Sequence, residues 1–196
     1  MSDGLGADYH NDPRVTAGRE NLDQVLKWIS SNHSYDDSEQ PGNNGSGYVN
    51  EETGPGTFLL YLTQDAIDEY VTPMDANAFE ENDPTYLDQQ PHTQLYKPFL
   101  ETCEQDGAII VSGNGRINSV NAYLEPPEET KDQADVTLGM GAKHISAARM
   151  SVLDEVLFSK ALSSSTGNIT TFVDGKTQEI MERDDFSSYW RETEDL

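Results

Sequence analysis

The chain has 196 residues, of which 36 are Asp or Glu and 12 are Lys or Arg, so its formal net charge is −24. Such an acidic surface repels nucleic acid and anionic membranes, which argues against a DNA- or RNA-binding role and against electrostatic membrane attachment. The single cysteine, Cys103, excludes an intrachain disulfide and a cysteine-rich zinc site. The length suits one domain with an apolar core.

Acidic residues are spread along nearly the whole chain and lysines are few, a pattern typical of proteins adapted to molar salt. In such salt the Debye length is about 3 Å and self-repulsion between acids is screened. An ordinary acidic cytosolic protein is the alternative. No apolar run approaches the roughly 18 residues of a membrane span, and the first residues lack a leader pattern, so we expect a cytoplasmic protein without a membrane partner.

The first 56 residues form an acidic segment that we expect to be flexible apart from one helix over about 16–31. Within that helix the apolar residues follow a helical spacing: Leu22, Val25, Leu26 and Ile29. From His33 to Gly56 the sequence is rich in Asp, Ser, Asn, Gly and Pro, which predicts a linker or a long surface loop.

A folded domain is expected over 57–185, followed by an acidic tail over 186–196 whose aromatic residues could fold back onto the domain. Apolar runs predict strands over 57–63 and 106–112, and a Gly-Asn-Gly turn signal predicts a hairpin partner over 116–124. Between these strands we expect helical turns over 64–71 and a helix over 92–104, which Pro98 would kink or delay.

The second half of this domain begins with an acidic surface loop over 125–135 and a Gly-flanked turn over 139–144. A helix over 145–151 and strands over 155–163 and 169–173 follow, the last of these being the final strand that we expect. Strands joined by tight turns and interrupted by single helices indicate an α/β domain with a mixed central β-sheet flanked by helices.

Two neighbouring residues of the Gly-flanked turn, Lys143 and His144, are candidates for binding a phosphate. Gly139 and Gly141 would let backbone N–H groups approach an anion, and the start of the following helix adds a positive dipole end. The hydroxyl of Ser146 would suit a phosphate oxygen. The alternatives are a solvated Lys-His pair and a capping serine. Farther along, an ion pair with an acid is as plausible for Arg149 as ligand contact.

A carboxylate, Asp106, precedes the most apolar strand and is followed by the small residues Gly107 and Ala108. These leave room for a ribose or a base. The carboxylate could orient or deprotonate a sugar hydroxyl and help to hold a divalent ion, with His144 completing a site for Mn²⁺ or Mg²⁺. A plain loop carboxylate is the alternative.

These residues, in this order, resemble the diadenylate cyclase (DAC) domain family in its archaeal, halophile-type form. The resemblance covers roughly residues 92–180 and rests on Asp106-Gly107-Ala108, Asn121 to Leu124, Gly141 to Arg149, and Ala161-Leu162-Ser163 before a glycine turn. It implies that two ATP molecules are condensed into the second messenger cyclic di-AMP, with release of two pyrophosphates. It also implies a homodimer or higher homo-oligomer, because each of two copies holds one ATP face to face.

The resemblance also implies residue roles. Asp106, Lys143 and His144 would be catalytic, and Asp106 and His144 would hold the metal. Further ATP contacts would come from Gly107, Ala108, Leu124, Gly141, Ser146 and Ser163.

The chain departs from the family pattern, which carries Arg-His-Arg on a Gly-Thr turn. Lys143 replaces the first arginine and keeps the charge but not the bidentate fork. Ile145 replaces the second arginine and cannot contact phosphate, and Ala142 replaces the threonine. Ser164 and Ser165 stand where an acidic residue is often found. A catalytically weak or inactive nucleotide-binding regulatory domain of the same fold is therefore the alternative, and an unrelated acidic interaction protein is a third hypothesis.

Overall fold

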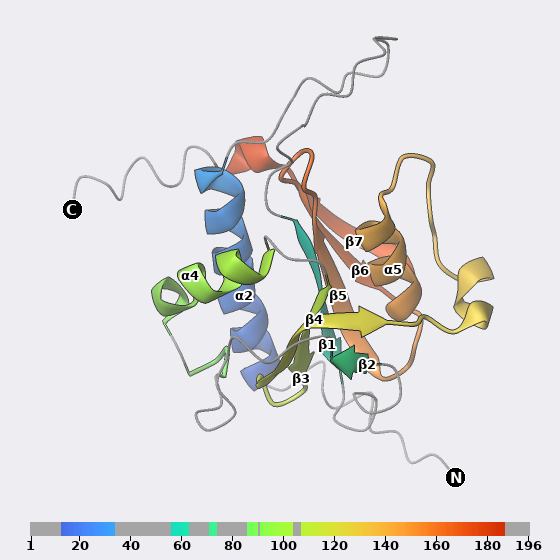
Figure 1. Ribbon diagram of the computed structural model, residues 1–196, viewed down its shortest axis with the longest axis horizontal. Coiled ribbons are helices and arrows are strands. Elements are labelled where there is room, and N and C mark those ends of the chain that lie inside the picture. The colour runs from blue at the N-terminus through green and yellow to red at the C-terminus, as the bar shows by residue number, and fades with distance from the viewer. Residues whose placement is uncertain are drawn as a thin grey trace.

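The computed structural model describes residues 13–33, 56–62, 71–73, 86–89, 91–103 and 107–186. In these ranges the chain forms a seven-stranded sheet of order β2-β4-β3-β1-β5-β6-β7. Helices α2 (Pro13–Asn32) and α4 (His92–Cys103) cover one face, and α5 (Ala142–Met150) covers the other (Figure 1). The strands are β1 (Thr57–Leu62), β2 (Val71–Pro73), β3 (Ala108–Ser112), β4 (Ile117–Leu124), β5 (Val156–Leu162), β6 (Ile169–Val173) and β7 (Lys176–Met181).

The sheet is mixed, as the sequence predicts, and β1 is the strand on which its two halves meet. β1 pairs parallel with β3 and antiparallel with β5. On one side β3 and β4 form the expected hairpin, which turns at Gly115 with a φ of 82°. On the other side β5, β6 and β7 form an antiparallel meander.

The face under α2 and α4 is filled by large apolar side chains. The residues whose spacing predicts the first helix, Leu22, Val25, Leu26 and Ile29, are all at most 1% exposed. They pack in one cluster with strand residues such as Leu59 and Tyr61. Because burying an aliphatic side chain stabilises by roughly 1.5–3 kcal/mol, this stripe is sufficient to dock α2 on the sheet.

A buried ion pair also joins α2 to the sheet. The Lys160 ammonium of β5 is completely buried, lies 2.7 Å from Asp23 Oδ1, and donates to Thr171 Oγ1 at 2.7 Å. Desolvation lowers the pKa of Lys160, and the neighbouring Asp23 carboxylate opposes that shift. Lys160 is completely buried and the Asp23 side chain is only 20% exposed, so we expect this pair to be costly to break.

The opposite face, under α5, is built from smaller side chains. Ala108, Ala122 and Ala161 from the strands lie in one cluster with Ala147 and Ala148 of α5. The helix backbone lies close to β5, so that Ser159 Oγ of β5 donates a hydrogen bond to the Ala147 carbonyl at 2.7 Å. Small residues therefore hold α5 close to the sheet.

Helix α5 begins at Ala142, so the prediction of a start at Ile145 was wrong. Gly141 is its N-cap, without a side-chain cap, and the Ile145 N–H donates to the Gly141 carbonyl at 3.1 Å. No Ser, Thr, Asp or Asn therefore marks this helix start in the sequence. The consequence is that Lys143 and His144 lie in the first turn of a helix rather than in the loop before it.

Strand β7 was not predicted, because its residues are mostly exposed and lack an apolar alternation. The signal was the Asp174-Gly175 turn, where both residues have positive φ, 49° and 74°, as a two-residue hairpin requires. β2 is missed as well, since the sequence predicts helical turns over 64–71, of which 64–70 lie outside the described residues. Pro98 lies inside α4 and does not delay its start.

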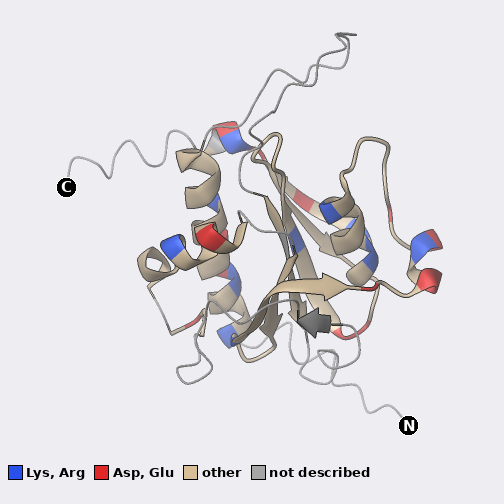
Figure 2. Ribbon diagram, in the orientation of Figure 1, with Lys and Arg blue, Asp and Glu red and all other residues tan. Residues whose placement is uncertain are grey.

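The end of the described chain folds back onto the body, where Phe186 is buried and Lys27 Nζ of α2 lies 5.6 Å from its ring centroid. The other tail aromatics, Tyr189 and Trp190, lie outside the described residues. Figure 2 shows that charged residues are concentrated on the helices and on η1 (Glu128–Asp132), while the strands carry few. Across the described ranges we find no helix both long and apolar enough to cross a bilayer.

Candidate functional site

The register of the sheet brings several sequence-predicted residues to one end of it. Ala108, at the start of β3, pairs with Phe58 and Ala122, and Phe58 pairs in turn with Ala161. The end of β4 at Leu124, the start of β3, and Ser163 after β5 therefore lie at the same end of the sheet. This is the end at which the first turn of α5 meets β5 and the turn that follows it.

A cavity of about 680 Å³ opens there, within the range of small-molecule sites. Of the sequence-predicted residues, Gly141, Lys143, His144 and Ser163 line it. Its other lining residues are Thr137, Leu138, Gly139, Met140, Ala142, Leu162, Ser164, Ser165, Thr166, Asn168, Thr170 and Ile180. A second cavity, under α2, measures about 170 Å³ and is too small for a nucleotide.

Lys143 lies at the cavity but its ammonium already has a partner, because Nζ donates to the Gly56 carbonyl at 2.6 Å. Gly56 is the last residue before β1 and packs against the turn after β5. A Cβ on Gly56 would lie only 2.7 Å from Ser164 Cβ. Lys143 thus ties the start of α5 to the start of β1 while keeping a positive charge beside the cavity.

His144 is half-buried and meets the Phe172 ring edge-on, with ring centroids 6.4 Å apart and an interplanar angle of 83°. Burial lowers the pKa of His144 below its ordinary value of 6.5. The imidazole is therefore neutral at pH 7, the form that coordinates a metal ion or exchanges a proton with a ligand. Positive charge at the cavity comes instead from Lys143 and from the N–H groups at the start of α5.

A hydroxyl-rich turn over 163–168 forms the opposite wall of the cavity. It is closed by hydrogen bonds from Ser163 N to the Asn168 carbonyl and from Gly167 N to the Ser163 carbonyl, both 2.9 Å. Ser163 Oγ accepts from Thr166 N at 3.2 Å and lies 3.1 Å from Ser165 Oγ. Such hydroxyls donate readily to phosphate oxygens.

Gly107 is required for a reason that the sequence did not suggest. Its φ is +114°, and a Cβ built on it would lie 2.5 Å from the Asn121 carbonyl carbon of β4. Asn121 itself has a φ of 54°. On its Cβ side, therefore, the small size of Gly107 accommodates the β4 backbone rather than a ribose or base.

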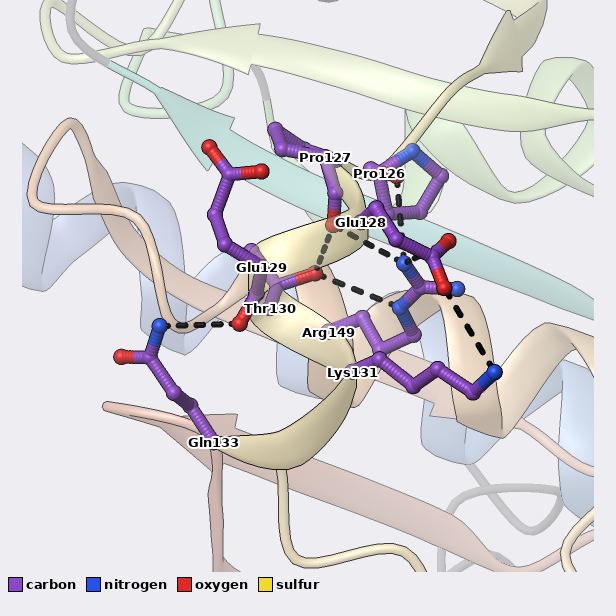
Figure 3. A network of polar contacts seen from close by, with 8 residues as sticks. All are labelled: Pro126, Pro127, Glu128, Glu129, Thr130, Lys131, Gln133 and Arg149. Carbon is purple, nitrogen blue, oxygen red and sulfur yellow. Dashed lines mark hydrogen bonds and ion pairs between the residues drawn. The ribbon is translucent and has the colours of Figure 1, made fainter.

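Arg149 belongs to a network of polar contacts (Figure 3) and does not line the cavity. Its guanidinium donates to the carbonyls of Pro126 and Pro127 at 3.2 and 2.9 Å and to Thr130 Oγ1 at 3.2 Å. Glu128 Oε2 lies 3.9 Å away on a side chain that is 82% exposed, so that ion pair adds little. Arg149 thus fastens the loop that carries η1 onto the end of α5.

The remaining candidates are placed differently. Ala108 and Leu124 are buried in the core under α5, and Ser146 is half-buried; none of the three lines the cavity. Asp106 lies outside the described residues.

Several lining residues are not among those predicted from the sequence, including Leu138, Asn168, Thr170 and Ile180. The run before Gly139 carried no signal of its own, but Thr170 is a polar residue in the predicted strand over 169–173 and could have been found. Ile180 could not have been found, because β7 itself was missed.

The described ranges contain no grouping of three or more His, Cys, Asp or Glu side chains that could hold a metal ion. A neutral imidazole fits a metal such as Mn²⁺, but His144 would need further oxygen ligands.

Comparisons with known proteins identify the family of the chain. The family model described as DisA bacterial checkpoint controller nucleotide-binding, or DAC, matches residues 66–177. The chain belongs to this family. A diadenylate cyclase from Haloferax volcanii is 31% identical over 127 residues, which are 64% of this chain and 44% of that protein. The chain thus aligns with less than half the length of this relative.

Solved structures of other proteins share the fold of this chain. DacA from Staphylococcus aureus, determined as a double mutant, matches with a TM-score of 0.50 at 17% identity, covering 88% of this chain and 92% of the other. A Bacillus cereus protein described as a hypothetical membrane spanning protein matches with a TM-score of 0.51 at 13% identity, covering 81% and 61%. Both confirm the mixed sheet flanked by helices that the sequence predicts.

Proposed function

We propose that this chain is a diadenylate cyclase that condenses two ATP molecules into cyclic di-AMP and two pyrophosphates. The observation that supports this most is the 680 Å³ cavity at the start of α5, which is lined by Gly141, Lys143, His144 and Ser163. These are motif positions of a chain that belongs to the DAC family. A cavity at the first turn of a helix offers N–H groups and a dipole that favour phosphate.

In this proposal each of two copies of the chain holds one ATP, and the copies meet face to face. The 3′-oxygen of each ATP attacks the α-phosphorus of the other, both α–β phosphoanhydride bonds break, and two pyrophosphates leave. Asp106 orients the attacking hydroxyl and takes up its proton. Lys143, the α5 N–H groups and Ser163 bind the triphosphate. Rate enhancement comes mostly from positioning and charge stabilisation, and a twofold arrangement is needed during turnover.

A divalent cation, Mn²⁺ or Mg²⁺, would be held by His144 and Asp106, with phosphate oxygens of ATP completing the ligands. Burial keeps the His144 imidazole neutral at pH 7, as a ligand must be. When bound, the cation neutralises negative charge on the triphosphate.

A nucleotide-binding regulatory domain with weak or no catalysis is a second candidate. Ile145 offers no charge to a phosphate, and the Lys143 ammonium is shared with the Gly56 carbonyl at 2.6 Å. Both reduce the positive charge free to stabilise a transition state, while the cavity and its hydroxyl turn still suit binding.

One experiment separates the two. The purified chain is incubated with ATP and Mn²⁺ in molar KCl, and cyclic di-AMP is measured by chromatography, with Asp106→Asn as the control. We expect product from the parent chain and a large loss in the control. ATP binding without product above the Asp106→Asn level would favour the regulatory domain, and no binding would reject both.

A further inference from the structure

The hydroxyl turn over 163–168 is supported from behind by α2. Ser30, near the end of α2, is completely buried, and its Oγ donates to the Gly167 carbonyl at 2.6 Å. The two residues are 137 positions apart in sequence, so this contact is made only by the folded chain. The other members of the turn line the cavity, whereas Gly167 does not. Helix α2 thus contacts the turn at Gly167, the member of the turn that does not line the cavity.

Two further contacts hold the same turn. The Arg183 N–H donates to Asn168 Oδ1 at 3.1 Å. On the other side, Gly56 packs against Ser164, and the Gly56 carbonyl accepts from Lys143 Nζ. The 163–168 turn thus contacts the start of β1, which in turn contacts Lys143 of α5. A shift at Gly167 would move the hydroxyls of the turn relative to Lys143.

We propose that Ser30 is a positioning residue for nucleotide binding, through which α2 sets the place of the 163–168 turn at the triphosphate. The inference rests on the proposed function of the cavity. Ser30 does not touch the cavity, so its effect is exerted through the Gly167 carbonyl. Removing the hydroxyl would leave a buried carbonyl without this donor, which favours displacement of the turn.

The test compares two adjacent serines of the same helix. In Ser30→Ala the bond to Gly167 is lost, whereas in Ser31→Ala the lost bond is a local one to the Lys27 carbonyl, 2.9 Å within α2. We expect Ser30→Ala to raise the KM and the Kd for ATP about five- to tenfold, the equivalent of one hydrogen bond, with kcat changed less than about twofold. Ser31→Ala is expected to leave both constants unchanged.

A purely structural role would lower the melting temperature of Ser30→Ala and leave the KM of the folded protein at the parent value, which would overturn the proposal. An equal KM rise in Ser31→Ala would do the same. If Ser30→Ala does not fold, Ser30→Cys keeps the size with a weaker donor, and a parent KM in that variant overturns the inference. Absence of ATP binding by the parent chain rejects the proposed function and this inference together. Parent binding that Ser30→Ala retains in full rejects this inference alone.

Discussion

The two faces of the sheet are packed for different purposes. Under α2 and α4 large side chains and the Lys160–Asp23 pair fill the space, and the cavity found there among the described residues measures about 170 Å³. Under α5 alanines bring the helix close to the strands, and a cavity of about 680 Å³ opens at its first turn. The face under α2 and α4 therefore contributes mainly to stability. The face under α5 holds the first turn of a helix close to the ends of the strands.

The largest effect is expected from Lys160→Ala on the α2 face. The substitution leaves the Asp23 carboxylate without its buried partner, and we expect the free energy of unfolding to fall by about 3–5 kcal/mol. Urea denaturation followed by circular dichroism measures it. The control is Lys97→Ala, whose partner Glu101 is 3.8 Å away and whose own side chain is 86% exposed; its effect should stay below about 1 kcal/mol. Equal losses in the two variants would contradict the distinction.

Arg149→Ala tests the hydrogen bonds at the end of α5, the helix that covers the other face of the sheet. Three hydrogen bonds to two carbonyls and a hydroxyl disappear, and we expect a loss of about 2–3 kcal/mol in unfolding free energy. Arg149→Lys should recover only part of it, because a lysine lacks the planar fork. Limited proteolysis should detect cleavage within 125–135 in the alanine variant first. Full recovery by lysine would mean that charge alone matters.

Ala161→Leu probes the small residues under α5. The added side chain would overpack the contact between β5 and α5, and we expect a loss of about 1–2 kcal/mol together with weaker ATP binding. Leu59→Met, a volume-conserving change on the opposite face, is the control and should leave ATP affinity unchanged. Unaltered ATP affinity in Ala161→Leu would show that the close approach of α5 is not needed for the cavity.

The smallest effect is a pH dependence from His144. Its pKa in the folded chain is lowered by burial, so the unfolded chain takes up the proton first as the pH falls. As the pH falls through about 6.5, the parent should therefore lose stability more steeply than His144→Gln. Denaturation curves at several pH values compare the two. Parallel pH profiles would show that His144 does not contribute.

Much of this contrast could be read from the sequence. The apolar spacing from Leu22 to Ile29 predicts α2, the run from Ala108 to Val111 predicts β3, and the motif residues Lys143 and His144 line the cavity. These features are local, so a short stretch of residues specifies them.

The features that the sequence did not predict lack a local sequence signal. Lys160 in β5 offered no hint of its partner, because Asp23 lies far away in the sequence and only the packed helix brings the two together. The helix start at Gly141 carried no capping side chain, and exposed β7 carried no apolar alternation. Gly107 is predicted to leave room for a nucleotide, whereas its close contact with the Asn121 backbone depends on a strand pairing that a sequence does not display.

The central position of β1 has a consequence for how the chain folds. Two units of the sheet consist of strands that are neighbours in sequence: β3 with β4, and β5 with β6 and β7. Because short loops join the strands within each unit, both units can form early. β1 joins these two units by parallel pairing to one and antiparallel pairing to the other, with partners far along the chain. We expect its insertion to come late, so that substitutions in β1 mainly accelerate unfolding and leave the folding rate nearly unchanged. The contact of Lys143 at the cavity with the Gly56 carbonyl, just before β1, would then form only in this last step.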